Sequence, residues 1–164
     1  AALYGNPADP SSQGAKYTIA ATVDAYLAAG AAPEKMVLGA PIYGRSWRGV
    51  GPANDGLFQA ASGAGAGTWE TGSVDYADLL NKVKTQPSVY QLHWDAAAGV
   101  PYVYAPTVDG GWFSTFENTQ SLNLKIDYLM SKGLGGIMFW EASGDVRDAN
   151  SADSLIGTAA KRLI

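Results

Sequence analysis

The chain has 164 residues, a formal net charge of −4 and no cysteine. The acidic balance argues against a basic surface for nucleic acid, and the lack of cysteine excludes disulfides, thiolate catalysis and Cys-ligated metals. Every apolar run is short and broken by Gly, Pro or polar residues, so no membrane span is expected.

Aromatic residues are numerous beside only 16% charged residues, with five Trp and nine Tyr. Aromatic faces stack on the apolar faces of sugar rings and their polar tips reach hydroxyls, so this composition permits a carbohydrate site. Packing in the core is the other explanation for each of these side chains.

The first third of the chain predicts a loop, a helix and a buried strand. Residues 1–14 are rich in turn formers. Residues 17–29 carry apolar side chains at helical spacing, and Gly30 ends that pattern. Residues 36–42 are a continuous apolar run, which is typical of a parallel strand buried on both faces. This order is the rhythm of alternating α/β units.

The middle of the chain interrupts that rhythm. The small residues of 62–67 predict an exposed loop, and 74–83 predict a short helix. Three runs rich in aromatic and β-branched residues, separated by turn formers, predict antiparallel hairpins; they are 89–94, 100–105 and 111–116. We therefore expect about 70 residues of α+β insertion after the first buried strand.

The last third returns to the first pattern. Residues 114–133 predict a helix that Gly133 ends. Residues 136–140 predict a second buried strand, and about 149–163 predict a final helix. Ligand groups of parallel barrels lie at the carboxyl ends of such strands.

Candidate ligand residues follow both buried strands. Tyr43, Arg45 and Trp47 alternate after the first strand, and Trp140 ends the second. Trp140 is suited to form an apolar floor under a sugar ring, unless it caps the core. Arg45 offers a rigid donor fork beside the Tyr43 hydroxyl, unless it pairs with a buried acid. Trp47 either stacks on sugar or fills its loop.

Trp69 and Glu70 follow the glycine-rich loop, where an aromatic ring beside an acceptor suits a sugar. The alternative is a packing residue next to a solvated acid. The carboxyls that a glycosidase needs have scattered candidates, which are Glu70, Glu117, Glu141 and Asp145. Asp145 and Asp148 fit better as helix-entry residues. His93 is the only histidine, so neither a histidine zinc site nor a Ser-His-Asp triad is expected.

Four segments, MVLGAPIYGRSW, GTWETGSVDYADL, HWD…VPYVY and GLGGIMFWEASGD, together resemble the C-terminal half of a bacterial family 18 glycoside hydrolase, a chitinase. The resemblance implies an α/β fold: a partial (β/α)8 TIM barrel with its last two strands and their helices. It also implies an α+β chitinase insertion domain between barrel strands seven and eight. The implied division is 1–47 (loop, helix six, strand seven), 48–117 (insertion) and 118–164 (helix seven, strand eight, helix eight).

The resemblance also implies substrate-assisted, retaining hydrolysis of β-1,4-linked N-acetylglucosamine polymers. The family's proton-donor Glu ends a DxxDxDxE motif on the fourth barrel strand, and this chain has no such motif. We therefore expect no catalytic residue in the chain and no hydrolysis by the chain alone. The implied substrate-binding residues are Trp140, Arg45, Tyr43, Trp69, Glu70 and Trp47.

The implied partners are chitin or chito-oligosaccharides and the N-terminal half of the barrel, with no cofactor and no metal. A secreted location is expected from the resemblance, although the chain shows no signal-peptide pattern. A non-catalytic chitin-binding module, similar to a chitinase-like lectin, is the alternative. Two barrel strands alone would leave open edges, which predicts self-association with another copy.

Overall fold

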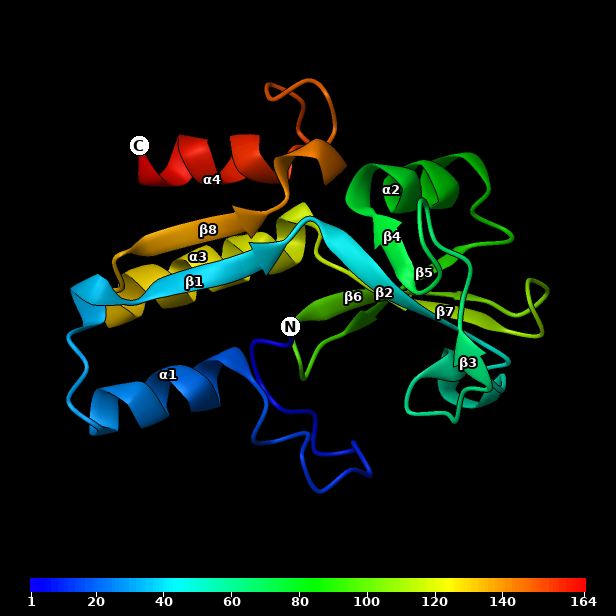
Figure 1. The fold of residues 1–164 in the computed structure, drawn as a ribbon, viewed down its shortest axis with the longest axis horizontal. Coiled ribbons are helices and arrows are strands. Elements are labelled where there is room, and N and C mark those ends of the chain that lie inside the picture. The colour runs from blue at the N-terminus through cyan, green and yellow to red at the C-terminus, as the bar shows by residue number, and fades with distance from the viewer.

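The computed structural model describes residues 1–164 as a mixed α/β fold with two sheets and four α-helices (Figure 1). The smaller sheet contains only β1 (Val37–Pro41) and β8 (Gly136–Trp140), which pair in parallel. The two apolar runs are therefore confirmed as adjacent parallel strands. Their pairing aligns the strand ends, with Pro41 opposite Trp140.

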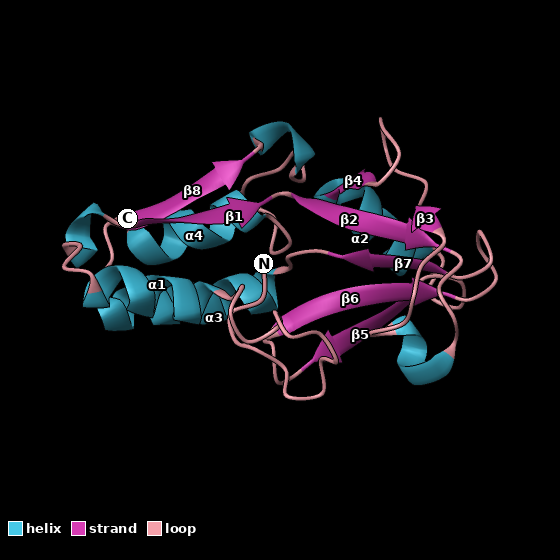
Figure 2. Ribbon diagram, turned by 60° about the horizontal axis from the view of Figure 1, so that its bottom comes forward, coloured by secondary structure: helices cyan, strands magenta, loops and turns pink.

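Three helices accompany the smaller sheet: α1 (Ile19–Ala28), α3 (Thr119–Lys132) and α4 (Leu155–Leu163). They lie on the same side of the sheet in Figure 2. Leu38 of β1 is buried among side chains of α1 and α3, including Val23 and Leu129. The other face of the sheet is open, since Val37 and Met138 are at least half exposed. The prediction of strands buried on both faces is wrong for this chain, because nothing in it covers that second face.

The helix ends follow their capping residues. The Asn118 side chain accepts a hydrogen bond from the Ser121 N–H, and the Ser121 hydroxyl accepts one from the Asn118 N–H, which forms a capping box. Gly133 ends α3 in the left-handed conformation, with φ 64°, as glycine at this position commonly does. Helix α4 begins later than predicted because Ser154 caps it, and residues 149–153 lie in turns.

The larger sheet has six strands in the order β3-β2-β7-β6-β5, with β4 also paired to β2. All its pairings are antiparallel, so the predicted hairpins are confirmed. Helix α2 (Tyr76–Thr85) packs beside β2 and β4. The strands are β2 (Tyr43–Arg48), β3 (Gly63–Ala64), β4 (Ser73–Asp75), β5 (Gln91–Asp95), β6 (Val100–Ala105) and β7 (Trp112–Thr115).

Strand β2 was not predicted, and it joins the two sheets. It continues from β1 after the single residue Ile42 and carries the chain into the larger sheet (Figures 1 and 2). The sequence grouped residues 43–47 with the first barrel segment, whereas their pairing places them in the larger sheet. The division into three segments otherwise stays a prediction.

Glycine at position 44 allows β2 to lie close to its neighbours. A Cβ atom at Gly44 would lie 2.5 Å from the Thr115 carbonyl oxygen and 2.6 Å from Leu79 Cδ1. Gly44 thus faces the core, while Tyr43 and Arg45 point to the other face of the sheet. No helix combines the length and hydrophobicity that a membrane crossing requires.

Candidate functional site

The two sheets meet at a small cavity, where β1 and β8 end and β2 begins. The Ile42 N–H donates a hydrogen bond to the Trp140 carbonyl, at 2.8 Å, and so holds the two strand ends together. The cavity has a volume of about 210 Å³. It is lined by Ile42, Tyr43, Arg45, Glu70, Ser73, Asp75, Trp140, Glu141 and Gly144.

Trp140 is the largest side chain at this cavity and is 67% exposed. It also borders a neighbouring hollow of about 310 Å³, together with Tyr43 and Met138. Within this chain Trp140 does not cap the core, and its role under a sugar ring stays a prediction. Its indole provides an accessible apolar surface at the end of β8.

Tyr43 and Arg45 lie on one face of β2, as their spacing predicted. The Arg45 guanidinium carbon is 5.0 Å from the centroid of the Tyr43 ring, which is a cation–π distance. Arg45 is exposed and takes part in none of the salt bridges. Within this chain Arg45 therefore forms no buried pair with an acid, and its role as a ligand donor stays a prediction.

Glu70 lines the cavity, and Trp69 lies next to it with 87% of its surface exposed. The Trp69 indole N–H donates a hydrogen bond to Asp75 Oδ2, at 2.9 Å. Asp75 and Ser73 also line the cavity, although sequence reasoning did not select them. Only their pairing with Tyr43 and Arg45 across β4 and β2 brings them there.

Trp47 does not reach this cavity. It lines a separate hollow of about 410 Å³ on the larger sheet and packs against Phe113, with ring centroids 6.1 Å apart. The structure therefore brings together four of the six predicted residues, namely Trp140, Tyr43, Arg45 and Glu70. Trp69 lies beside these four residues, where its indole is hydrogen-bonded to Asp75. Trp47 lies at a different hollow.

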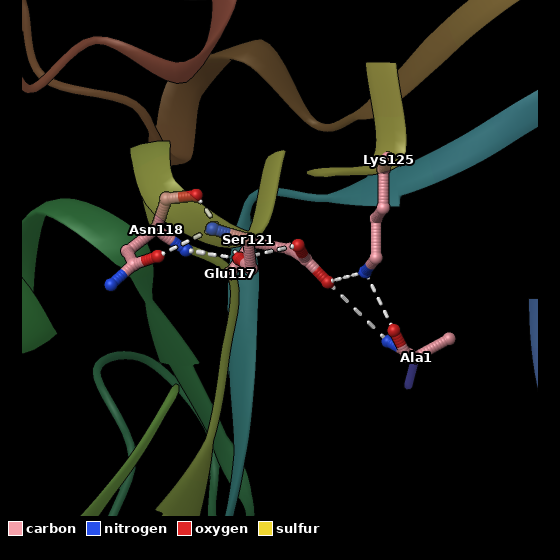
Figure 3. Close-up of polar contacts among 5 residues, drawn as sticks. All are labelled: Ala1, Glu117, Asn118, Ser121 and Lys125. Carbon is pink, nitrogen blue, oxygen red and sulfur yellow. Dashed lines mark hydrogen bonds and ion pairs between the residues drawn. The ribbon is translucent and has the colours of Figure 1, made fainter. Parts of the chain in front are cut away.

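Two of the candidate carboxyls have structural partners. Glu117 is buried and pairs with the Lys125 ammonium, while its second oxygen accepts from the Ser121 hydroxyl at 2.9 Å (Figure 3). Asp145 accepts hydrogen bonds from the Leu155 and Ile156 N–H groups at the start of α4, which confirms its helix-entry role. Neither acid lines the cavity.

The cavity thus combines an exposed indole, one guanidinium and three carboxylates, which belong to Glu70, Asp75 and Glu141. A ring with apolar faces and equatorial hydroxyls matches this set, because the indole takes a face while charged groups donate to and accept from hydroxyls. Neither Cys nor His, the side chains that most often supply a thiolate nucleophile or activate a hydroxyl, lines the cavity.

Comparison with known proteins gives the same family for sequence and structure. The family model described as "Glycosyl hydrolases family 18" matches residues 1–145. Chitinase A1 of Niallia circulans is 40% identical over 134 residues, which are 79% of this chain and 18% of the relative. Chitinase 1 of Aphanocladium album is 34% identical over 161 residues, which are 98% of this chain and 34% of the relative.

Among solved structures, chitinase ChiA74 from Bacillus thuringiensis superposes with a TM-score of 0.87 at 35% identity. The match covers 99% of this chain and 28% of ChiA74. The chain therefore spans about a third or less of the length of these relatives.

Proposed function

Because the chain belongs to glycosyl hydrolase family 18, we propose that it is part of a chitinase that hydrolyses β-1,4-linked N-acetylglucosamine polymers. The observation that carries the proposal is the convergence of Trp140, Tyr43, Arg45 and Glu70 on one cavity at the strand ends. The relatives named as chitinases support the same substrate class.

Each residue of the cavity has a proposed task. The Trp140 indole is the floor under one sugar ring, and the Arg45 guanidinium and Tyr43 hydroxyl donate to its oxygens. Glu70 accepts from sugar hydroxyls, and the exposed Trp69 ring stacks on an adjacent unit. Trp47 contacts the sugar chain farther along the larger sheet.

The proposed reaction is substrate-assisted and retains the anomeric configuration. The carbonyl oxygen of the substrate's own N-acetyl group attacks the anomeric carbon, while a Glu gives its proton to the leaving oxygen. That Glu is not among the 164 residues in our proposal. These residues bind and orient the sugar, and the acid comes from the rest of the barrel.

The open face and edges of the smaller sheet are where we place the rest of the (β/α)8 barrel. β1 and β8 pair only with each other, although a barrel closes only when all its strands are paired. An apolar hollow of about 510 Å³ lies between α1 and β1 and includes Val37 and Tyr26. The missing strands and helices would cover these surfaces, and pairing with a second copy is the alternative. We also propose that the whole protein is secreted.

A fluorogenic chitobioside tests whether this chain binds the sugar while the rest of the barrel supplies the acid. The isolated chain is expected to give no turnover. A chimera in which these residues replace the matching segment of ChiA74 is expected to hydrolyse the substrate, and Trp140→Ala in the chimera lowers kcat/KM at least tenfold. Turnover by the isolated chain would contradict the proposed absence of the acid.

The alternative function is chito-oligosaccharide binding without cleavage, as in a chitinase-like lectin. The lining of the cavity suits this function too, because an indole, a guanidinium and carboxylates bind a sugar whether or not an acid from another segment cleaves it. The residues upstream of this chain in its parent protein decide between the two functions. An intact DxxDxDxE motif there supports hydrolysis, and a substituted Glu supports binding alone.

A further inference from the structure

A row of aromatic rings in contact crosses the face of the larger sheet that carries Tyr43 and Arg45. Trp47 of β2 packs on Phe113 of β7, with ring centroids 6.1 Å apart, and Phe113 packs on Tyr102 of β6 at 5.3 Å. Phe113 and Tyr102 are buried, whereas Trp47 at the end of the row is 37% exposed. Trp47 is thus held by a rigid neighbour while one part of its ring faces solvent.

Three hollows lie between Trp140 and Trp47 along this face. The cavity at Trp140 shares Tyr43 and Arg45 with a second hollow of about 260 Å³. This second hollow shares Thr115 with the hollow at Trp47, of about 410 Å³. The three hollows therefore follow one another along β2, and the groove in the following paragraphs means this series of hollows.

The length of the groove suits a polymer. Alternate side chains on one face of a strand are about 6.8 Å apart, so Tyr43 and Trp47 are separated by roughly 14 Å along β2. This span is longer than one pyranose ring. A sugar on Trp140 and a sugar at Trp47 therefore belong to different units of one chain.

We propose that the Trp47 hollow is a further subsite of the groove. It binds a distal N-acetylglucosamine unit of the polymer whose proximal unit lies on Trp140. The inference rests on the proposed function, because it extends the same sugar chain along the same face.

The lining of the Trp47 hollow fits an N-acetylated sugar. The exposed edge of Trp47 offers a stacking surface, and Leu57 and Phe58 offer apolar contacts for the acetyl methyl group. The Thr115 hydroxyl and the Gln59 amide lie at the same hollow and supply donors and acceptors for hydroxyls.

The backbone of the loop over this hollow has an unusual conformation. Phe58 has φ 61°, a left-handed conformation that a bulky residue rarely adopts. Residues held in such conformations gather at ligand sites. Phe58 lines the hollow and does not belong to the buried cluster that contains Tyr102 and Phe113.

The indole N–H signals of the five Trp residues report on the two ends of the groove separately by NMR. Single Trp→Phe variants assign the signals. Chitobiose is expected to shift the Trp140 signal and leave the Trp47 signal in place, whereas chitohexaose shifts both. The Trp112 indole signal serves as the internal reference, because this side chain is buried and its N–H donates a hydrogen bond to the Ala66 carbonyl.

Affinities measured by titration calorimetry give the second readout. Trp47→Ala weakens chitohexaose binding about tenfold and leaves chitobiose binding unchanged, while Trp47→Phe causes a smaller loss. Trp140→Ala weakens both ligands. Leu92→Ala is the matched control: this side chain is 53% exposed on the opposite face of the same sheet, and its loss changes neither affinity.

The outcomes separate the inference from the proposed function. If Trp140 responds to both sugars while Trp47 responds to neither, the subsite is refuted and the proposed function stands. If Trp140 responds to neither sugar, the proposed function fails and the subsite fails with it. Because the NMR shifts are read on the unaltered chain, poor folding of Trp47→Ala would not block the test.

Discussion

At the scale of single residues, the hydrogen bond between Trp69 and Asp75 sets the orientation of an exposed aromatic ring. An indole that is 87% exposed has few packing contacts to hold it. Asp75 is itself held, because its N–H donates to Thr68 Oγ1 at 2.9 Å, and the Thr68 hydroxyl donates to Asp78 at 2.9 Å. The network therefore presents the Trp69 ring in one position beside the cavity.

Replacing Asp75 by Ala is expected to free the Trp69 ring and weaken chito-oligosaccharide binding by about 1 kcal/mol, the usual net contribution of one hydrogen bond. Asp75→Asn keeps an acceptor oxygen and is expected to bind nearly as the unaltered chain does. Calorimetry gives the affinities, and the line width of the Trp69 indole signal reports the ring's mobility. Equal affinity and line width in both variants would rule out this positioning role.

At the scale of elements, a buried ion pair fastens helix α3 to the end of β7. Glu117 follows β7, and Lys125 lies two turns along α3. Both side chains are at most 1% exposed, and the Lys125 ammonium also donates to the Ala1 carbonyl at 2.6 Å (Figure 3). The pair joins three separate segments in one core position.

Lys125→Met is expected to destabilise the chain by about 3–5 kcal/mol, because the buried Glu117 carboxylate then keeps only the more distant Ala1 ammonium, at 3.6 Å, as a cationic partner. The double variant Glu117→Leu/Lys125→Met recovers most of that loss, since both buried charged side chains are then replaced by apolar ones. Urea unfolding measures both. The control is Lys82→Met, which breaks a partly exposed pair with Asp78 and costs less than about 1 kcal/mol. If Lys125→Met lowers the free energy of unfolding as little as Lys82→Met does, the buried pair contributes little to stability.

At the scale of the whole molecule, buried tyrosines link stability to high pH. Burial raises the pKa of Tyr76, Tyr102, Tyr104 and Tyr128 above the ordinary value of 10.0, and nearby carboxylates raise the pKa of Tyr76 and Tyr102 further. The Tyr76 hydroxyl also donates to the Asp153 carbonyl at 2.7 Å. In the folded chain these hydroxyls hold their protons at a pH where the unfolded chain releases them.

The free energy of unfolding is therefore expected to be insensitive to tyrosine ionisation below about pH 9 and to fall as the pH rises above about 10. The sign follows because the unfolded state binds fewer protons than the folded state in that range. Urea midpoints from neutral to alkaline pH measure the effect. Tyr76→Phe makes the fall shallower, whereas an unchanged slope would show that Tyr76 does not contribute.

Local patterns predicted the elements that depend on neighbours in the sequence. The apolar runs predicted β1 and β8, and Gly133 predicted the end of α3. Turn formers between aromatic runs predicted the hairpins of β5, β6 and β7. Strand β2 was not predicted because Tyr43–Arg48 has no periodic apolar pattern. Its pairing partners lie on β3, β4 and β7, far along the chain. Pairing between such distant segments leaves little mark on the sequence of one strand.

The sequence by itself determined the family, the paired apolar strands and the residue types that stack on and hydrogen-bond to a sugar. The tertiary structure decided which of them share a cavity, because the register of β2 with β4 brings Asp75 and Ser73 to Tyr43 and Arg45. It also separated Trp47 from Trp140, since β2 leaves the smaller sheet and carries Trp47 onto the larger one. Residue type is a local property, whereas shared position depends on pairing across the chain.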